Sequence, residues 1–387
     1  MPTAKKVEIS KDFEVNVNNK ILKWAIETSG WNKLELAKKI GINENDLNKV
    51  LDGKKNLTLN KLEKLCKLIK RPIAFFLLNE IPPEENKPLP KDYRMVKKRE
   101  SFSKEALMAI RVARRLQAVS KELLQNLGET LEAKVKHVTT EEDSKKIANE
   151  YRNKIENLEE LQKKLNPNNF FNLLRDFIEK QNIFVFQLPI PTDADIGGFT
   201  LSDETPNVIV INSKYQIKSR IFTLIHEFGH ILLNQSIVDI PEKSLQANEN
   251  QNKIEKWCND FASEFLLPDS IAKTLFTENK ASLTDTKTLN KLSNRWKVSK
   301  SCLLYKMYRL DFITKPEYDE VLGRPYKEKK MKGGPSPDVR CISEKGKRFI
   351  SLVATNLDNE FITLKDALDY LSIKSNHYPK ILEKIKE

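Results

Sequence analysis

The stretch His226-Glu227-Phe228-Gly229-His230 holds two of the four histidines of this 387-residue chain, placed four residues apart on either side of a glutamate. Apolar residues flank it, and this predicts a buried helix. Because an α-helix has 3.6 residues per turn, both imidazoles project from one face and can reach a single Zn²⁺. Glu227, beside the first histidine, can then take a proton from water that zinc acidifies.

Short matches of this kind also occur on ordinary helices, so the flanking sequence decides between the two interpretations. Ile221-Phe222-Thr223-Leu224-Ile225 precedes the motif and Ile231-Leu232-Leu233 follows it. Burial of such a helix would leave three polar side chains in need of partners, which favours a metal site. A third protein ligand is still required.

A second predicted helix, over residues 253–268, offers that ligand, because its apolar residues recur at helical spacing. Glu255 lies on the flank of the apolar face, and Asn259, one turn later, can orient its carboxylate. Two histidines and a glutamate with an open fourth position form a catalytic rather than a structural zinc site. Alternatively, Glu255 is a solvated charge that pairs with Lys253 or Lys256. The rival ligands are Glu249, Asp260 and Glu264.

Several further runs follow one another between residues 166 and 313. They are Gly197-Gly198-Phe199, Val208 to Asn212, Arg220 to His230, Glu255, Cys258-Asn259, Phe261-Ala262 and Leu267-Pro268. In this order they resemble the ImmA/IrrE family of zinc metallopeptidases. The resemblance implies a gluzincin-like site in which His226, His230 and Glu255 bind zinc and Glu227 is the general base. Cys258 stands where that family usually has alanine, and we expect a small buried thiol rather than a ligand.

The composition indicates an intracellular protein of two or three domains. The N-terminus lacks an apolar signal core, and no stretch is long enough to cross a bilayer, so we expect a cytoplasmic protein without a membrane partner. The four cysteines lack the spacing of a disulfide framework or a thiolate zinc site. The net charge of +13 is concentrated in residues 1–80 and 321–348, where it indicates either nucleic-acid binding or a solvated lysine-rich surface.

The basic N-terminal region has the pattern of a small helical domain. Apolar periodicity predicts helices near residues 19–28, 33–40, 44–52 and 58–70. Gly41-Ile42-Asn43 joins the second to the third, with Asn43 placed to cap the third helix. This arrangement resembles an XRE-type helix-turn-helix, of the kind found fused to ImmA/IrrE peptidases, and implies binding to DNA or to a helical partner.

The residues available for DNA contact give a mixed signal. In the third helix Asn45, Asn48 and Lys49 can read bases, and Lys38 and Lys54 can hold phosphates, as can Lys33, Lys39 and Lys55. Glu44 and Asp46 would place two carboxylates close to the DNA. The alternative is a module that serves for dimerisation or for docking a substrate protein.

The predicted fold is multidomain and mainly α. It consists of a tail over 1–18, the helix-turn-helix domain over 19–80, a Pro-rich linker over 81–100 and a helical connector over 101–165. An α+β zincin-like domain with a small sheet over 166–313 is followed by a basic linker or loop over 314–348 and a helical segment over 349–387. Expected strands are 183–186 and 208–211. The helix-turn-helix cadence over 289–310 is expected to pack within the peptidase domain.

These features predict a zinc metalloendopeptidase that cleaves a protein, expected to be an XRE-type repressor of a mobile element or stress response. One alternative is a DNA-binding regulator or antitoxin-like protein whose zinc domain is a sensor. Another is a peptidase that cleaves its own linker; a homodimer also remains open. Candidates for stabilising the oxyanion are Tyr215, Arg220, Tyr305 and Tyr308, whereas His137 and His377 are expected at the surface.

Overall fold

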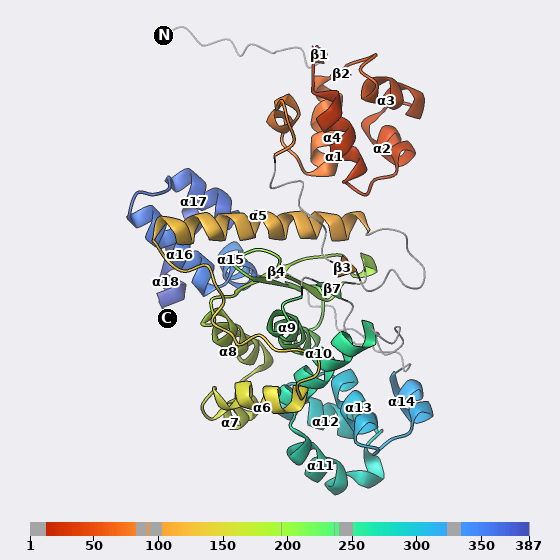
Figure 1. Cartoon of the computed structure of the whole chain (residues 1–387), viewed down its shortest axis with the longest axis vertical. Coiled ribbons are helices and arrows are strands. Elements are labelled where there is room, and N and C mark those ends of the chain that lie inside the picture. The colour runs from red at the N-terminus through yellow and green to blue at the C-terminus, as the bar shows by residue number, and fades with distance from the viewer. Residues whose placement is uncertain are drawn as a thin grey trace. The chain divides into compact units, whose positions relative to one another are not determined.

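The computed structural model of the chain describes residues 13–82, 91–92, 103–194, 196–235, 237–239, 251–322 and 334–386. Its internal contacts divide it into two units, residues 1–89 with 100–112, and residues 90–99 with 113–387 (Figure 1). The expected mainly α, multidomain architecture is confirmed. Within the described ranges, no helix has the length and apolar character needed to span a membrane.

The N-terminal unit contains the helices that the sequence predicts, within one residue at each end. They are α1 (Asn19–Glu27), α2 (Lys33–Ile40), α3 (Glu44–Leu51) and α4 (Leu59–Ile69), followed by the 3₁₀ helix η1 (Ile73–Leu77). Two short strands, β1 (Glu14–Val15) and β2 (Leu57–Thr58), pair antiparallel. The expected tail over 1–18 therefore ends in an ordered strand, and residues 1–12 lie outside the described ones.

Local signals in the sequence explain the turn between α2 and α3. Gly41 ends α2 with φ +81°, a left-handed conformation that glycine adopts without steric cost. The side chain of Asn43 accepts a hydrogen bond from the backbone N of Asp46 at 2.7 Å, so the predicted cap is confirmed. Leu36, Ala37 and Leu47 are fully buried in the core of this unit. The turn thus fixes α3 against α2 by both capping and packing.

The second unit is organised around one five-stranded sheet. Its strands, in spatial order, are β3 (Lys91–Asp92), β7 (Ile237–Asp239), β5 (Gly198–Leu201), β6 (Val208–Asn212) and β4 (Phe184–Leu188). β4 is parallel to β6, β5 is antiparallel to β6 and β7, and β3 is parallel to β7. The sequence predicts β4 and β6 but not the other three, because strands of two to four residues are too short to show an alternating pattern.

Helices cover both faces of this sheet. On one face, α8 (Pro167–Glu179) and α9 (Ile217–Leu232) bury their apolar sides against Val185, Ile209 and Ile211. On the other, Phe349 of α16 (Lys347–Asp358) packs edge-on against Phe186, with ring centroids 5.3 Å apart. The part of helix α5 (Lys104–Asn126) that belongs to this unit, from Ala113 on, also lies on this side, where Asn126 donates to the side chain of Asn356 at 3.0 Å. The sheet is therefore covered by helices on both faces.

A helical layer packs against α9 on the side away from the sheet. Its helices are α6 (Ser144–Asn153), α7 (Leu158–Lys164), α10 (Gln251–Leu266), α11 (Asp269–Glu278), α12 (Thr286–Trp296), α13 (Lys300–Arg309) and α14 (Lys315–Leu322) (Figure 1). Buried polar groups connect them: Gln162 donates to the carbonyls of Leu266 and Trp296 at 2.8 and 2.6 Å. The predicted packing role of residues 289–310 is confirmed, because Leu289, Leu292 and Trp296 lie in the same core as α9.

Residues 314–348 differ from the predicted basic linker or loop. Helix α14 occupies the start of this range and α15 (Pro337–Lys345) its end, while residues 323–333 lie outside the described ones. The many charged residues in this range made its few apolar positions hard to recognise as the buried sides of helices, although Tyr318, Val321 and Cys341 are buried. The C-terminal segment is helical as expected, with α17 (Leu364–Leu371), η7 (Ser375–His377) and α18 (Tyr378–Lys386). Of the linker over 81–100, only residues 81–82 and 91–92 are described.

Candidate metal centre

Helix α9 carries His226, Glu227 and His230 through the middle of the second unit. Every residue from Ile221 to Leu232 is buried, which agrees with the uninterrupted apolar flanks of the motif. The helix is held between the sheet and α10, so its polar side chains are directed into the protein rather than into solvent. Glu227 and His230 have no exposed surface, and His226 is 2 % exposed.

Glu255 of α10 completes a cluster with the two histidines. The Nε2 atoms of His226 and His230 are 3.1 Å apart, and each lies 3.4–3.5 Å from a carboxylate oxygen of Glu255. Tetrahedral coordination with bonds of about 2.0–2.2 Å separates ligand atoms by roughly 3.3–3.6 Å. The two distances to Glu255 lie in this range and the Nε2–Nε2 distance is slightly shorter, so the three side chains could share one metal ion with a coordination position left over. Among the described residues they form a group that could hold a metal ion, and we call it the metal-binding group.

Strand β5 supplies a partner for Glu227 that the sequence did not reveal. The hydroxyl of Thr200 donates to Oε2 of Glu227 at 2.8 Å, and Thr200 is fully buried. Gly198, on the same strand, allows this approach: a Cβ there would lie 2.6 Å from Cγ2 of Thr223 and 3.1 Å from Oε1 of Glu227. The strand therefore both makes room for the carboxylate and orients it.

The residues around His230 explain the unusual cysteine. The sulfur of Cys258 lies 3.5 Å from Nδ1 of His230, the ring nitrogen opposite the one that faces Glu255. Gly229 leaves the space for this thiol, since a Cβ at Gly229 would come within 3.2 Å of the sulfur. Cys258 therefore contacts the side of the His230 ring that faces away from Glu255, and it is not part of the metal-binding group. Asn259 is buried one turn after Glu255, as the spacing predicts.

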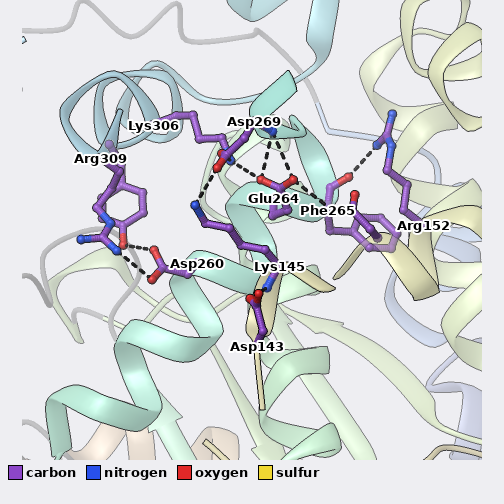
Figure 2. Close-up of polar contacts among 11 residues, drawn as sticks. Asp143, Lys145, Arg152, Asp260, Glu264, Phe265, Asp269, Lys306 and Arg309 are labelled. Atoms are coloured by element: carbon purple, nitrogen blue, oxygen red, sulfur yellow. Dashed lines mark hydrogen bonds and ion pairs between the residues drawn. The ribbon is translucent and has the colours of Figure 1, made fainter. Parts of the chain in front are cut away.

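The rival carboxylates on α10 have other roles. Glu264 accepts the backbone N of Asp269 at 3.0 Å and pairs with Nζ of Lys306 at 2.6 Å (Figure 2). Lys306, 3 % exposed, also pairs with Asp269, which in turn accepts from Lys145 at 2.6 Å. Two lysines and two carboxylates thus balance their charges and connect α6, α10, α11 and α13. Burial raises the pKa of Asp269, but the hydrogen bonds from Lys145 and Lys306 outweigh it and hold that pKa well below its usual value.

Asp260 is also engaged away from the metal-binding group. It accepts the hydroxyl of Tyr305 at 2.7 Å and pairs with Arg309 at 3.1 Å. Burial and the carboxylate of Asp260 raise the pKa of Tyr305, which keeps its proton. The hydroxyl of Tyr305 already donates its hydrogen bond to Asp260, which argues against Tyr305 as the residue that stabilises an oxyanion. Glu249, the remaining rival ligand, lies outside the described residues.

The other oxyanion candidates also have observed partners. Arg220 donates to Oε1 of Gln187 at 2.5 Å, and the ring of Tyr308 packs against Tyr318 with centroids 5.6 Å apart. Tyr215 follows β6, where its backbone N donates to the carbonyl of Asn212. These contacts assign none of the candidates to the metal-binding group.

In the N-terminal unit, all candidate DNA-contacting side chains except Lys33, which is half-buried, are exposed. They are Lys38, Lys39, Asn45, Asn48, Lys49, Lys54 and Lys55. Asp46, one of the two carboxylates that oppose DNA binding, pairs with Lys55 at 3.2 Å, which offsets its charge at the N-terminal end of α3. His137 is exposed, as expected, whereas His377 is half-buried; both lie outside the metal-binding group.

Comparison with known protein families identifies both units. Residues 178–308, which include the metal-binding group, match the peptidase family M78, described as the IrrE N-terminal-like domain. This segment is an IrrE-like peptidase domain. Residues 22–73 match the Cro/C1-type helix-turn-helix DNA-binding domain. The predicted fusion is confirmed, and the two domains together indicate a protein of the metallopeptidase-like, DNA-binding regulator kind. Among curated proteins, none matches the chain.

Proposed function

We propose that the IrrE-like domain is a zinc-dependent endopeptidase. The observation that carries this proposal is the spacing of the Nε2 atoms of His226 and His230 and the carboxylate of Glu255, which is close to the edge lengths of a zinc coordination tetrahedron. A nitrogen, nitrogen and oxygen donor set favours zinc among the common divalent ions and leaves a position for a reactant. Zinc bound there supplies acidified water and a Lewis acid for a carbonyl.

The residues of the chain then divide the remaining work. Glu227 accepts a proton from water and returns it to the leaving amine. Thr200, through its 2.8 Å hydrogen bond to Glu227, holds this carboxylate in one orientation. Cys258, whose sulfur lies 3.5 Å from Nδ1 of His230, orients that ring, and Asn259, one turn after Glu255 on α10, orients the carboxylate of Glu255. The side chains of His226, Glu227, His230 and Glu255 are all buried, so water screens their charges only weakly and the electrostatic interactions among them are strong.

We further propose that the substrate is a transcriptional repressor of the XRE type and that cleavage changes gene expression. The support is the fusion itself: a Cro/C1-type domain on the same chain either reaches the DNA sites of such repressors or pairs with their helices. Charge neutralisation of Asp46 by Lys55 favours DNA contact by α3.

The test compares wild-type protein with Glu227→Gln and with Glu278→Gln, an exposed glutamate on α11 that serves as the matched control. We expect Glu227→Gln to keep one zinc per chain, measured by mass spectrometry of the metal. In cells that produce Glu227→Gln, the amount of new protein N-termini created by cleavage should be at least about a hundredfold lower than in cells that produce wild type or the control. Equal cleavage by wild type and Glu227→Gln would sink the peptidase proposal and favour a sensor without proteolysis.

A second candidate, cleavage of the chain's own linker, is favoured by strand β3. Lys91 and Asp92 pair with Ile237 and Val238 of β7, and Val238 pairs with Phe199, the neighbour of Thr200. Extended peptides can bind a protein by adding a strand to a sheet, and Lys91 and Asp92 pair with β7 in this way, as part of a bound substrate would. A cut within residues 83–102 would release the helix-turn-helix domain.

Intact-mass analysis of purified, zinc-loaded protein tests self-cleavage. We expect a cut in residues 83–102 that appears in wild type and is absent from Glu227→Gln. If cleavage is intramolecular, its first-order rate is independent of protein concentration. A wild-type chain that stays intact while cleaving another protein excludes this second candidate and leaves the first one standing.

A further inference from the structure

A cleft separate from the metal-binding group lies where the C-terminal helix α15 meets the peptidase domain. Its volume is about 490 Å³, within the range of about 300–1,000 Å³ typical of small-molecule sites. It is bounded by α8, the end of β4, the first turns of α9 and α15. The lining residues on which the argument rests are Phe171, Asp176, Ile217, Arg220, Val339 and Ile342.

Most of the cleft wall is apolar. Phe171 and Ile217 line it from the peptidase domain, and Val339 and Ile342 line it from α15. Val339 is 43 % exposed although it belongs to a helix that otherwise packs against the sheet. Phe171 itself is buried, but the half-buried Ile217 and Ile342 and the exposed Val339 leave apolar surface open on both walls. This favours a ligand with an apolar body, since its binding removes that surface from water.

One end of the cleft carries the positive charge of Arg220, with which no carboxylate of the described residues forms an ion pair. Arg220 is half-buried and donates to the neutral side chain of Gln187 at 2.5 Å. Among the described residues no carboxylate pairs with Arg220, and its Nε is buried without a hydrogen-bond partner. Burial lowers the pKa of Arg220 from a value so high that the group remains charged.

Its neighbour Arg175 provides the contrast. Arg175 pairs with Glu179 at 3.0 Å and donates to the carbonyl of Ser343 at 2.8 Å. The charge of Arg175 is therefore matched by Glu179, whereas no carboxylate of the described residues pairs with Arg220. Lys347 adds a further cation to the lining and Asp176 a single acid. The cleft thus combines apolar walls with one half-buried guanidinium.

We propose that this cleft binds a small monocarboxylate with an apolar body, its carboxylate on Arg220 and its body along Phe171, Ile217 and Val339. A guanidinium matches a carboxylate geometrically, and an anion supplies the charge that the site lacks. The volume exceeds that of a bare anion, which leaves the apolar walls to be covered by the rest of the ligand.

A ligand in the cleft would contact α9, the helix that carries the metal-binding motif. Arg220 lies six residues before His226 on α9, and Gln187 connects Arg220 to the carbonyl of Ser343 on α15 through a 2.8 Å hydrogen bond. A ligand held between Arg220 and Val339 therefore joins α15 to α9. The C-terminal helices become the element through which such a molecule is sensed.

Calorimetric titration of the full-length protein tests the site with decanoate and 3-phenylpropionate as probes. We expect saturable binding of at least one probe, with one ligand per chain. Decanol, which lacks the charge, should bind at least about tenfold more weakly than decanoate. Acetate, which lacks the body, should bind more weakly still.

Three variants locate the binding. Arg220→Met removes the cation and should weaken binding at least about tenfold. Val339→Glu introduces a negative charge at an exposed position of the lining, where the fold tolerates it, and should have a similar effect. Val112→Glu, at a valine that is 44 % exposed and outside the cleft, should bind like wild type.

Absence of saturable binding of both probes, or equal binding by wild type, Arg220→Met and Val339→Glu, overturns the proposal. Acetate that binds as tightly as decanoate overturns the apolar half of it. None of these readouts depends on peptidase activity.

Discussion

The buried metal-binding group and the exposed candidate DNA-contacting side chains on and beside α3 present opposite situations. His226, Glu227, His230 and Glu255 are at most 2 % exposed, and the ligand atoms of the two histidines and Glu255 lie within 4.8 Å of one another. Lys38 of α2, Asn45, Asn48 and Lys49 of α3, and Lys54 in the turn that follows are exposed. Buried polar groups must be satisfied inside the protein, so their arrangement shows what they bind. Exposed groups are satisfied by water, and their function depends on a partner.

This difference sets the size of the effects that substitutions should have. Changes in the buried region act on metal binding, stability and catalysis together, because each side chain has fixed partners. Changes on the surface of α3 act on association alone. The following experiments test that contrast, from the largest expected effect to the smallest.

Glu255→Ala removes one of three proposed metal ligands and should weaken zinc binding by at least about a hundredfold, since even loss of a supporting residue costs about 10–100-fold. Competition with a chromophoric chelator measures it. Glu278→Ala, at an exposed glutamate of α11, is the matched control. Unchanged zinc affinity in Glu255→Ala would show that Glu255 is not a ligand and that another residue supplies the third one.

Lys306→Met should reduce the free energy of unfolding by about 3–5 kcal/mol, because it leaves Glu264 and Asp269 without a buried cation. Urea denaturation of the metal-loaded protein measures the change. Lys287→Met, at an exposed lysine of α12, should change it by less than about 0.5 kcal/mol. A loss below about 1 kcal/mol in Lys306→Met contradicts a stabilising role for the cluster.

Thr200→Val removes the hydroxyl that orients Glu227 and should lower kcat about tenfold while zinc content is unchanged. Thr200→Ser keeps the hydroxyl and should recover most of the rate, which a purely structural role of this residue would not predict. Steady-state kinetics on the cleaved protein measure both variants. Equal rates for Thr200→Val and wild type rule out the positioning role.

Lys49→Gln should weaken DNA binding only severalfold and lower the slope of log affinity against log salt by about one. Fluorescence anisotropy at several salt concentrations measures both quantities. Lys64→Gln, at an exposed lysine of α4, is the comparison. If the two variants bind DNA alike, α3 does not face the DNA, and docking of a protein partner becomes the better explanation.

Short-range patterns in the sequence predicted a large part of the fold. The helices of the N-terminal unit, the cap by Asn43 and the strands β4 and β6 all follow from neighbouring residues. The prediction of a linker over 314–348 was wrong at both ends of this range, where α14 and α15 lie. Runs of lysine and arginine concealed the buried positions Tyr318, Val321 and Cys341. Charge dominates composition, whereas a helix needs only one apolar stripe.

The sequence by itself determined the metal helix, because two histidines four residues apart share a face of any α-helix. It also put Glu255 forward, but among rivals. Only the tertiary structure brought Glu255 to the histidines, turned Asp260 and Glu264 to Tyr305 and Lys306, and placed Thr200 on Glu227. The same holds for the cleft at Arg220, which needs Phe171 and Val339 from distant helices. Such contacts depend on how layers pack, and periodicity along the chain carries no information about that.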